Sequence, residues 1–290
     1  MNILLFTEQA LNGVQFGMTL FLMAAGMTLI LGIMNLLNLA HGSLYTVGAY
    51  AAVKLQAWSG SFVLGILLAI PAVALLGMVL EIVALRTLYR RDHLDQALCT
   101  FGLILFLDEM VRVIWGLRPL PTTLPPLLDG SVELVPGISY STYRLAVIAV
   151  GLVVALCLYL TITRTRIGML IRAGANDREM IGALGIDINT LYTIVFGIGA
   201  ALAGLAAMMV APLVGVQSSM GDNVVILTLV VITVGGIGSV RGAFLAALLV
   251  GVFDTFGRAL LPPALSSVAI YVLMAVILLW RPRGLFPAIR

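Results

Sequence analysis

Residues 31–50, LGIMNLLNLAHGSLYTVGAY, decide how this chain can fold. They join two apolar runs through a polar segment in which Asn35, Asn38 and His41 stand among glycines. Backbone that leaves helical geometry is not tolerated against lipid, because no water is present there to satisfy its N–H and C=O groups. This pattern therefore predicts a helix break that is buried in protein and lines a polar cavity.

The composition of the whole chain requires a membrane. Of 290 residues, 61% are hydrophobic and 10% are charged, whereas a soluble domain usually has about a quarter of its residues charged. Since a span needs roughly 20 mainly apolar residues, we expect an all-α polytopic membrane protein with about eight or nine transmembrane helices. Broken or re-entrant segments are expected within 34–61 and 223–261 of this single domain, 1–290. The predicted spans are 9–33, 42–58, 61–85, 94–115, 140–163, 188–211, 223–240, 242–261 and 265–280.

Basic residues gather on one predicted face of the membrane. Because Lys and Arg are enriched in cytoplasmic loops, this asymmetry places the C-terminus in the cytoplasm of an inner-membrane protein, and nine spans then place the N-terminus outside. The residues on the predicted cytoplasmic face are Arg86, Arg90, Arg91, Arg164, Arg166, Arg172, Arg178, Arg241, Arg281, Arg283 and Arg290. Those elsewhere are Lys54, Arg112, Arg118, Arg144 and Arg258.

Several functional classes are excluded by what the sequence lacks. Cys99 and Cys157 lie inside apolar runs and do not indicate a disulfide framework. The scattered basic residues argue against nucleic-acid binding. His41 and His93 are the two histidines, and no G-x-S-x-G nucleophile motif occurs, so we expect no catalytic residue, no metal and no cofactor. Two roles are considered for His41. It either forms hydrogen bonds at the helix break or lines a substrate path.

A second break stands at 231–244, VITVGGIGSVRGAF. Both breaks show an apolar run, a Gly-containing turn, the pair His41-Gly42 or Arg241-Gly242, and another apolar run. Paired interruptions of this kind are typical of internal repeats in transporters. We expect the following residues to line a translocation path or to form the helix breaks: Asn35, Asn38, His41, Gly42, Ser43, Gly235, Gly236, Gly238 and Ser239.

Charged residues inside the predicted spans occur at helix-pairing distances. Asp108 and Glu109 precede Arg112 by four and three positions, and Asp254 precedes Arg258 by four. Such spacing brings opposite charges together on one helix face and lowers the cost of charge near the membrane interface. The alternative is a proton relay through Asp108 and Glu109, with Glu81 as a further member.

The predicted outer loop, 116–139, is rich in proline. Proline at this density blocks regular helix and favours a stiff, extended path. The loop is interpreted either as a stiff connection or as a docking surface for an external partner. Its prolines are Pro119, Pro121, Pro125, Pro126 and Pro136.

The predicted inner segment, 164–189, contains one short helix between two capping signals. Asn176 followed by Glu179 has the spacing of a capping box, and Gly185 stands where a helix ends in left-handed geometry. A helix this short is marginal alone and must rest against something. Lipid headgroups and a groove on a cytoplasmic protein are the two candidates, and the small non-aromatic apolar residues favour the protein groove.

These segments together resemble the LivH-type permease subunits of branched-chain amino-acid ABC importers. Asn38-Leu39-Ala40-His41-Gly42 is similar to the Asn-Phe-Ala-His-Gly signature of that family, with Leu39 in place of phenylalanine. The segment 172–186 resembles its cytoplasmic coupling segment. Residues 235–242 resemble its late glycine motif, and Arg-Pro-Arg-Gly-Leu-Phe at 281–286 resembles its closing motif. The resemblance covers nearly the whole chain.

The resemblance implies a permease domain that translocates small amino acids of the branched-chain type or related small polar solutes. It implies a LivM-type second permease subunit in a heterodimer, two cytoplasmic ABC ATPase subunits and a periplasmic solute-binding protein, all in a lipid bilayer. The chain has no GxxxxGK[ST] phosphate loop. We therefore expect that the partner subunits hydrolyse ATP and that this chain is not itself an enzyme. The implied ATPase-coupling residues are Asn176, Glu179, Ile181, Ala183, Leu184 and Gly185. An autonomous proton-coupled transporter that uses Asp108, Glu109 or Glu81 is the alternative.

Overall fold

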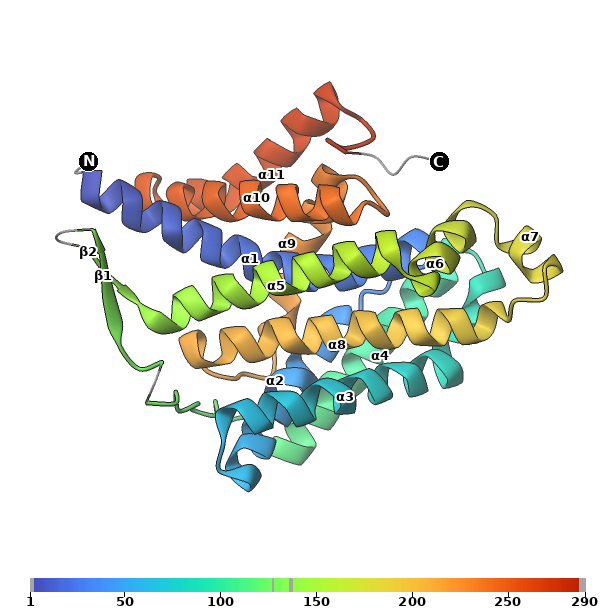
Figure 1. Cartoon of the computed structure of the whole chain (residues 1–290), viewed down its shortest axis with the longest axis horizontal. Coiled ribbons are helices and arrows are strands. Elements are labelled where there is room, and N and C mark those ends of the chain that lie inside the picture. Colours follow the sequence, from blue (N-terminus) through green and yellow to red (C-terminus); the bar gives the residue numbers. More distant parts are fainter. Residues whose placement is uncertain (1–2, 127, 136–137, 287–290) are drawn as a thin grey trace.

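The computed structural model describes residues 3–126, 128–135 and 138–286, which form a bundle of helices (Figure 1). Every predicted span has a helix in its place, and α3 continues through a π-helical turn, Glu81–Leu85, and a 3-10 turn, Arg86–Arg90. The predicted all-α polytopic architecture is confirmed. The helices are α1 (Ile3–Met34), α2 (His41–Ser59), α3 (Phe62–Leu80), α4 (His93–Trp115), α5 (Thr142–Arg164), α6 (Arg166–Asn176), α7 (Arg178–Ala183), α8 (Ile188–Val214), α9 (Met220–Gly235), α10 (Val240–Leu260) and α11 (Pro263–Trp280).

Fewer helices meet the length and composition required of a membrane span than the sequence predicted. Within the described ranges, 6 are long and apolar enough to span a bilayer by length and composition: α1, α3 with its extension to Tyr89, α5, α8, α10 and α11. Helix α9 is apolar but has only 16 residues. The predicted count of about eight or nine spans is therefore approximate.

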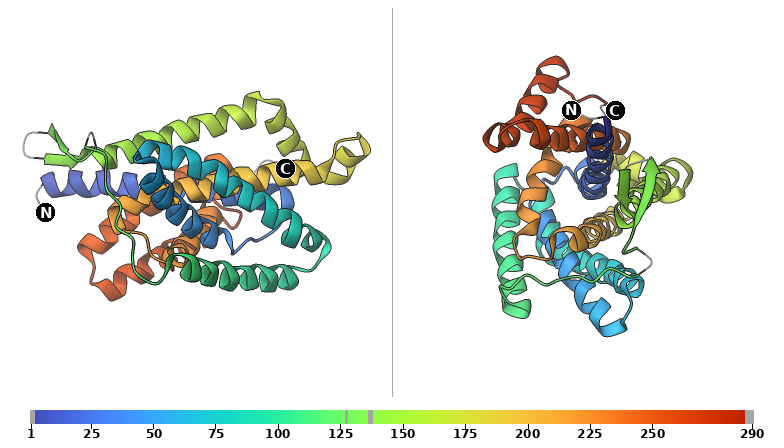
Figure 2. Two further views of the ribbon diagram at one scale, coloured as in Figure 1. Left: turned by 90° about the horizontal axis from the view of Figure 1, so that it is seen from below. Right: turned by 90° about the vertical axis from the view of Figure 1, so that its left-hand side faces the viewer.

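Helices α1 and α8 form the core of the bundle. Viewed along the long axis, they lie between α2 and α3 on one side and α10 on the other (Figure 2, right). Phe21 on α1 and Phe196 on α8 are completely enclosed, as expected for helices that are apolar all round. By contrast α3, α5 and α11 each leave a row of large apolar side chains exposed, for example Leu67, Leu156 and Leu279. Those rows are the surfaces suited to lipid.

Glycines allow the core helices to approach one another at backbone distance. A Cβ at Gly48 of α2 would lie 2.4 Å from the Cα of Gly204 on α8, and a Cβ at Gly26 of α1 would lie 2.6 Å from the carbonyl oxygen of Gly199 on α8. Helices associate in lipid through close van der Waals packing, which small residues permit. These two crossings therefore fix α1 and α2 against α8.

The two ends of the bundle carry different structures (Figure 1). The N-terminus and a small β-hairpin lie at one end. The second end holds α6 and α7, and the C-terminal segment turns back towards it. Arginines of the predicted cytoplasmic set occur in these elements, for example Arg172 in α6 and Arg241 at the start of α10. Which side of the membrane this end faces stays a prediction.

The outer loop contains a β-hairpin that the proline-based prediction did not anticipate. Strands β1 (Ser131–Val135) and β2 (Ile138–Ser141) pair antiparallel, since this part of the loop alternates apolar and polar residues as strands do. Residues 117–126, which precede the hairpin, form no helix, and Leu120 exchanges two backbone hydrogen bonds with Val216, at 3.0 and 3.2 Å. Pro136 lies outside the described residues.

Candidate functional site

The first break folds back into the bundle. Helix α1 ends before Asn35, which is the one residue other than glycine with a positive φ, 52°, in the described part of the chain. Asparagine tolerates this left-handed geometry better than most residues. The Nε2 atom of His41, at the start of α2, lies 3.1 Å from the position of a Cβ at Gly26, about 12 Å before the end of α1. Helix α2 therefore begins inside the bundle.

Two polar side chains at this break are buried without protein partners. Asn38 and His41 are fully enclosed, and neither the amide of Asn38 nor the two ring nitrogens of His41 meet hydrogen-bond geometry with the described residues. The backbone of Met23 is the group that approaches the His41 ring, without completing a well-formed bond. An unpaired buried polar group costs about 1–3 kcal/mol, so these groups are available to solvent or to a solute.

The start of α2 is tied to both α4 and α9. The hydroxyl of Ser43 donates to a carboxylate oxygen of Asp108 on α4 at 2.9 Å. The backbone N–H of Gly221 on α9 donates to the hydroxyl of Thr46 at 3.1 Å, and Gly42 meets Gly221 at backbone distance. The predicted residues Gly42 and Ser43 therefore hold three helices together at one point.

The charged pairs within the bundle match the spacing argument in two of three cases. Glu109 pairs with Arg112 at 3.5 Å, and Asp254 pairs with Arg258 at 2.8 Å. Asp108, which the spacing also grouped with Arg112, instead accepts the Ser43 hydroxyl. That partner comes from another helix, and spacing along one helix cannot reveal it.

Glu81 belongs to a buried hydrogen-bond network between α3 and α8. Its carboxylate is fully enclosed and accepts from Tyr89 at 2.8 Å, from Thr193 at 2.6 Å and from Arg86 at 3.1 and 3.3 Å. A buried carboxylate with this many donors and a cationic partner is satisfied where it stands. The hydrogen-bond and ion-pair partners of Glu81 among the described residues include neither Asp108 nor Glu109.

The second break is a glycine turn between α9 and α10. Gly236 and Gly238 take φ values of 100° and 80°, which only glycine adopts readily. The hydroxyl of Ser239 accepts the N–H of Gly242 at 3.1 Å and so caps α10. A Cβ at Gly242 would lie 2.1 Å from the carbonyl oxygen of Gly235. The sequence pattern of this break thus corresponds to a tight turn.

The C-terminal segment is fastened to the second break. The N–H of Leu285 donates to the carbonyl of Val234 at 2.8 Å, and that of Phe286 donates to Gly235 at 3.1 Å. These carbonyls belong to the last turn of α9, which has no helical partners for them. Gly284, with φ 82°, approaches the turn so closely that a Cβ there would lie 2.6 Å from Gly236. No pattern in the sequence predicted this docking.

The two breaks approach each other at the end of α1. A Cβ at Gly32, in the last turns of α1, would lie 3.0 Å from the Cα of Gly238. Among the described residues, no hydrogen bond joins the predicted polar residues of the first break to Ser239 of the second. The predicted set therefore divides into an interior group around Asn38, His41 and Ser43, and an end group around Gly236, Gly238 and Ser239.

The inner segment contains two helices, where the sequence predicted one. Helix α6 precedes α7. Thr165 caps the start of α6, because its hydroxyl accepts the N–H of Gly168 at 3.1 Å. The cap of α7 is Asp177 and not Asn176, because Asp177 accepts the N–H groups of Glu179 and Met180, each at 3.0 Å. Asn176 is the last residue of α6. Aspartate and asparagine are equally good caps, so the pattern left the choice between neighbours open.

The predicted end of the short helix at Gly185 is confirmed. Gly185 has a φ of 84°, and its N–H donates to the carbonyl of Gly182 at 3.0 Å. The N–H of Ile186 donates to the carbonyl of Ile181 at 3.4 Å. This pair of bonds is the Schellman arrangement. Helix α7 is therefore closed at both ends.

Helix α7 projects from the end of the bundle (Figure 1; Figure 2, left). Met180 is 56% exposed and Leu184 is 74% exposed, while Ile181 is 4% exposed. The predicted coupling residues Glu179 and Ala183 are also exposed. One face of α7 thus anchors it, and the other is open.

The anchored face connects α7 to the first break. A Cβ at Gly174 of α6 would lie 4.0 Å from the side chain of Ile181, 3.7 Å from that of Ile33 and 3.5 Å from that of Leu191. Ile33 stands two residues before the strained Asn35.

Asp187 caps helix α8, which follows α7 in the chain. The hydroxyl of Thr190 donates a hydrogen bond to the Asp187 carboxylate at 2.5 Å, and this bond lowers the pKa of the Asp187 carboxyl.

Comparisons with known proteins identify the family of the chain. Residues 9–278 match the family described as "Branched-chain amino acid transport system / permease component". The chain is 32% identical to the high-affinity branched-chain amino acid transport system permease protein BraD of Pseudomonas aeruginosa, over 97% of this chain and 95% of that protein. It is 29% identical to LivH of Escherichia coli K12 (97% and 96%) and 26% identical to LivM of the same organism (94% and 69%). The chain therefore belongs to the family of branched-chain amino acid transport system permease components.

Proposed function

We propose that this chain is the transmembrane subunit of an ATP-driven importer for small amino acids of the branched-chain type or related small polar solutes. The names of its relatives and the family match over 9–278 support this assignment. The chain would lie in a bacterial inner membrane with its C-terminus in the cytoplasm. Its own sequence offers no phosphate-binding loop, so the energy would come from separate ATPase subunits.

The observation that carries the proposal is the form of α7. A short helix closed at both ends, with Met180 and Leu184 exposed at its tip, has the features of an apolar knob that fits a protein groove. Its partner would be a cytoplasmic ATPase subunit, because α7 lies at the end where the basic residues gather. Exposed apolar residues of this kind mark an interaction surface when they stand outside the lipid.

Movement of α7 has a physical route to the first break. Ile181 packs through Gly174 towards Ile33 at the end of α1, and the break begins two residues later at Asn35. Because Gly32 also contacts Gly238, displacement of the end of α1 would move both breaks. We place the translocation path beside the interior group, where Asn38 and His41 offer unpaired polar atoms.

The remaining partners follow from the relatives and from the ends of the bundle. The chain is similar to LivH and, less closely, to LivM, which supports pairing with a homologous LivM-type subunit. The outer loop, held by its two bonds between Leu120 and Val216, is the candidate contact for a periplasmic solute-binding protein. Two ATPases, one under each permease subunit, complete the proposed complex.

The proton-coupled alternative receives little support from the site. Glu81 is fully satisfied by Arg86, Tyr89 and Thr193, and Glu109 pairs with Arg112. A relay needs carboxyl groups that exchange protons along a connected path. These two carboxylates instead make separate ion pairs.

The test is substitution of Leu184 by aspartate, in the complex assembled with the ATPase subunits of the same transport system. The loss of an apolar anchor at a protein groove should weaken copurification of the ATPases about tenfold or more, and ATP-driven uptake of radiolabelled leucine into proteoliposomes should fall with it. Leu117→Asp is the matched control, because Leu117 is 77% exposed in the outer loop. Undiminished assembly of Leu184→Asp would remove the coupling assignment, and leucine uptake driven by a pH gradient without ATP would favour the alternative.

A further inference from the structure

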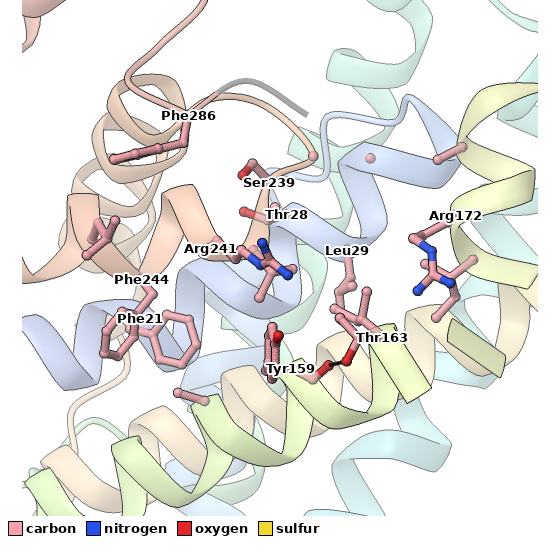
Figure 3. A pocket seen from close by; sticks show the side chains of 18 of the residues that line it. Phe21, Thr28, Leu29, Tyr159, Thr163, Arg172, Ser239, Arg241, Phe244 and Phe286 are labelled. Carbon is pink, nitrogen blue, oxygen red and sulfur yellow. Dashed lines mark hydrogen bonds between the residues drawn. The ribbon is translucent and has the colours of Figure 1, made fainter. Parts of the chain in front are cut away.

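A large cavity lies beside α6 and is not used by the proposed transport mechanism. Its volume is about 890 Å³, and α1, α5, α6, the start of α10 and the C-terminal segment form its walls (Figure 3). Ile33 and Ile171 belong to the wall shared with the coupling segment. A cavity of this volume accommodates a sizeable organic ligand.

The walls of the cavity are mainly apolar. Phe21 and Leu29 come from α1, Phe244 and Leu245 come from α10, and Phe286 comes from the C-terminal segment. Figure 3 shows the rings of Phe21 and Phe244 next to one another. Their centroids lie 5.1 Å apart and the rings meet edge to face, which is a favourable geometry for an aromatic pair. This wall suits a hydrocarbon chain rather than a hydrated ion.

Two arginines supply positive charge to the same cavity. Arg172 and Arg241 are both exposed, and neither forms a salt bridge with a carboxylate in the described ranges. The guanidinium carbon of Arg241 lies 5.0 Å from the centre of the Tyr159 ring, which also lines the cavity. Stacking of this kind holds a guanidinium in place while leaving its N–H donors available.

A buried hydroxyl adds an independent sign of a ligand. Thr28 lines the cavity and is only 1% exposed, yet its Oγ1 atom has no hydrogen-bond partner among the described residues. Figure 3 draws Thr28 on the same side of the cavity as Ser239 and Arg241. A buried hydroxyl normally finds a partner, so this one is a donor held ready for a bound molecule.

We propose that this cavity binds an anionic phospholipid, whose headgroup meets Arg172 and Arg241 and whose acyl chain lies along the aromatic wall. The chemistry of the walls requires a ligand that is apolar at one end and anionic at the other. Basic pockets between transmembrane helices near the membrane surface are suited to such headgroups. One wall of the cavity is α5, whose Leu156 and Leu160 lie outside the lining and are exposed. The inference does not depend on the proposed transport function.

The experiment measures which lipid stays bound to the full-length protein. The protein is reconstituted in nanodiscs with equal amounts of phosphatidylglycerol and phosphatidylcholine, released into detergent and examined by native mass spectrometry. We expect retention of phosphatidylglycerol over phosphatidylcholine by the wild-type protein. Because an arginine near the membrane contributes about fivefold to binding of anionic lipid, Arg172→Gln together with Arg241→Gln should lower retention about thirtyfold.

The controls separate a built site from general attraction and from free anion binding. Arg166 is an exposed arginine of the same helix, α6, but its side chain does not line the cavity. Arg166→Gln should therefore leave lipid retention unchanged. Addition of inorganic phosphate should not displace the lipid, because phosphate cannot use the aromatic wall. Equal retention of both lipids by the wild-type protein, equal losses in the double variant and in Arg166→Gln, or displacement by inorganic phosphate would each overturn the proposal. The wild-type measurements stand even where the double variant fails to fold.

Discussion

The close contact between α2 and α8 predicts that replacing glycine by alanine lowers the free energy of unfolding at Gly48. The same replacement at Gly102, outside this contact, should raise it. A Cβ at Gly48 would lie 2.4 Å from the Cα of Gly204, whereas carbon atoms in good contact lie about 3.5–4.0 Å apart. Gly48→Ala must therefore push the two helices apart by about 1 Å or more. Both atoms in conflict belong to backbone or are attached directly to it, so no side chain can rotate to relieve the clash.

The magnitude follows from two opposing terms. Overpacking of a buried contact costs about 1–3 kcal/mol, and separation of the helices also disturbs the neighbouring bonds of Thr46 to α9. Replacement of glycine by alanine within a helix returns about 1 kcal/mol of helix propensity. Loss of the hydrogen bond between Thr46 and Gly221 adds about 1 kcal/mol to this cost. After the offset for helix propensity, we expect Gly48→Ala to lower the free energy of unfolding by about 1–3 kcal/mol.

Gly102 in α4 provides the matched control, since a Cβ there meets nothing within 4 Å. Gly102→Ala should retain the propensity gain alone and raise the free energy of unfolding by up to about 1 kcal/mol. The assay is unfolding in mixed micelles of dodecylmaltoside and sodium dodecyl sulfate, followed by tryptophan fluorescence. If Gly48→Ala is as stable as the wild type, or if both variants gain stability, the close approach of α2 and α8 is wrong.

Two further predictions concern the inner end. Asp177→Ala removes the acceptor of two N–H groups, each at 3.0 Å, and should destabilise α7 by about 1 kcal/mol. Hydrogen exchange of the α7 amides should then accelerate severalfold, while Asn176→Ala should change it little; the reverse order would return the cap to Asn176. Gly284→Ala places a Cβ 2.6 Å from the glycine turn at a φ of 82° and should release the C-terminal segment. Trypsin should then cleave after Arg283 faster than in the wild type, and Gly257→Ala, which has open space, should not change the rate; equal cleavage in all three proteins would contradict the docking.

The elements that the sequence predicted are those that a membrane imposes locally. A span must be apolar over its whole length, so hydropathy located all nine apolar helices. It also located the first break, in which Asn38 and His41 are buried as expected and Asn35 is exposed. Glycine at a helix end carries its own geometric meaning, and Gly185 behaves as predicted. Gly236 and Gly238 likewise take positive φ values.

The elements that the sequence did not predict depend on contacts between distant segments. Ser43 bonds to Asp108 across 65 positions, and Leu285 bonds to the last turn of α9 through backbone groups that every sequence possesses. The predicted break residues form an interior group and an end group, and Gly32 contacts Gly238 between the two breaks. Pattern along the chain can identify residues that leave a helix, but only the packing shows which of them meet.

The position of α6 connects the two proposals of function made above. On one side its Gly174 lies between Ile181 of α7 and Ile33 of α1, and on the other side its Arg172 lines the cavity. Ile33 lies against Gly174 and also lines the cavity. A lipid that fills the cavity would therefore press against the residue through which α7 reaches the first break. Occupancy of the cavity and movement of α7 would act on the same end of α1, so a lipid with different affinity for the two positions of α1 would shift their populations. The expected consequence is that phosphatidylglycerol content changes the rate of ATP-driven uptake in the wild-type complex and has a smaller effect after Arg172→Gln and Arg241→Gln.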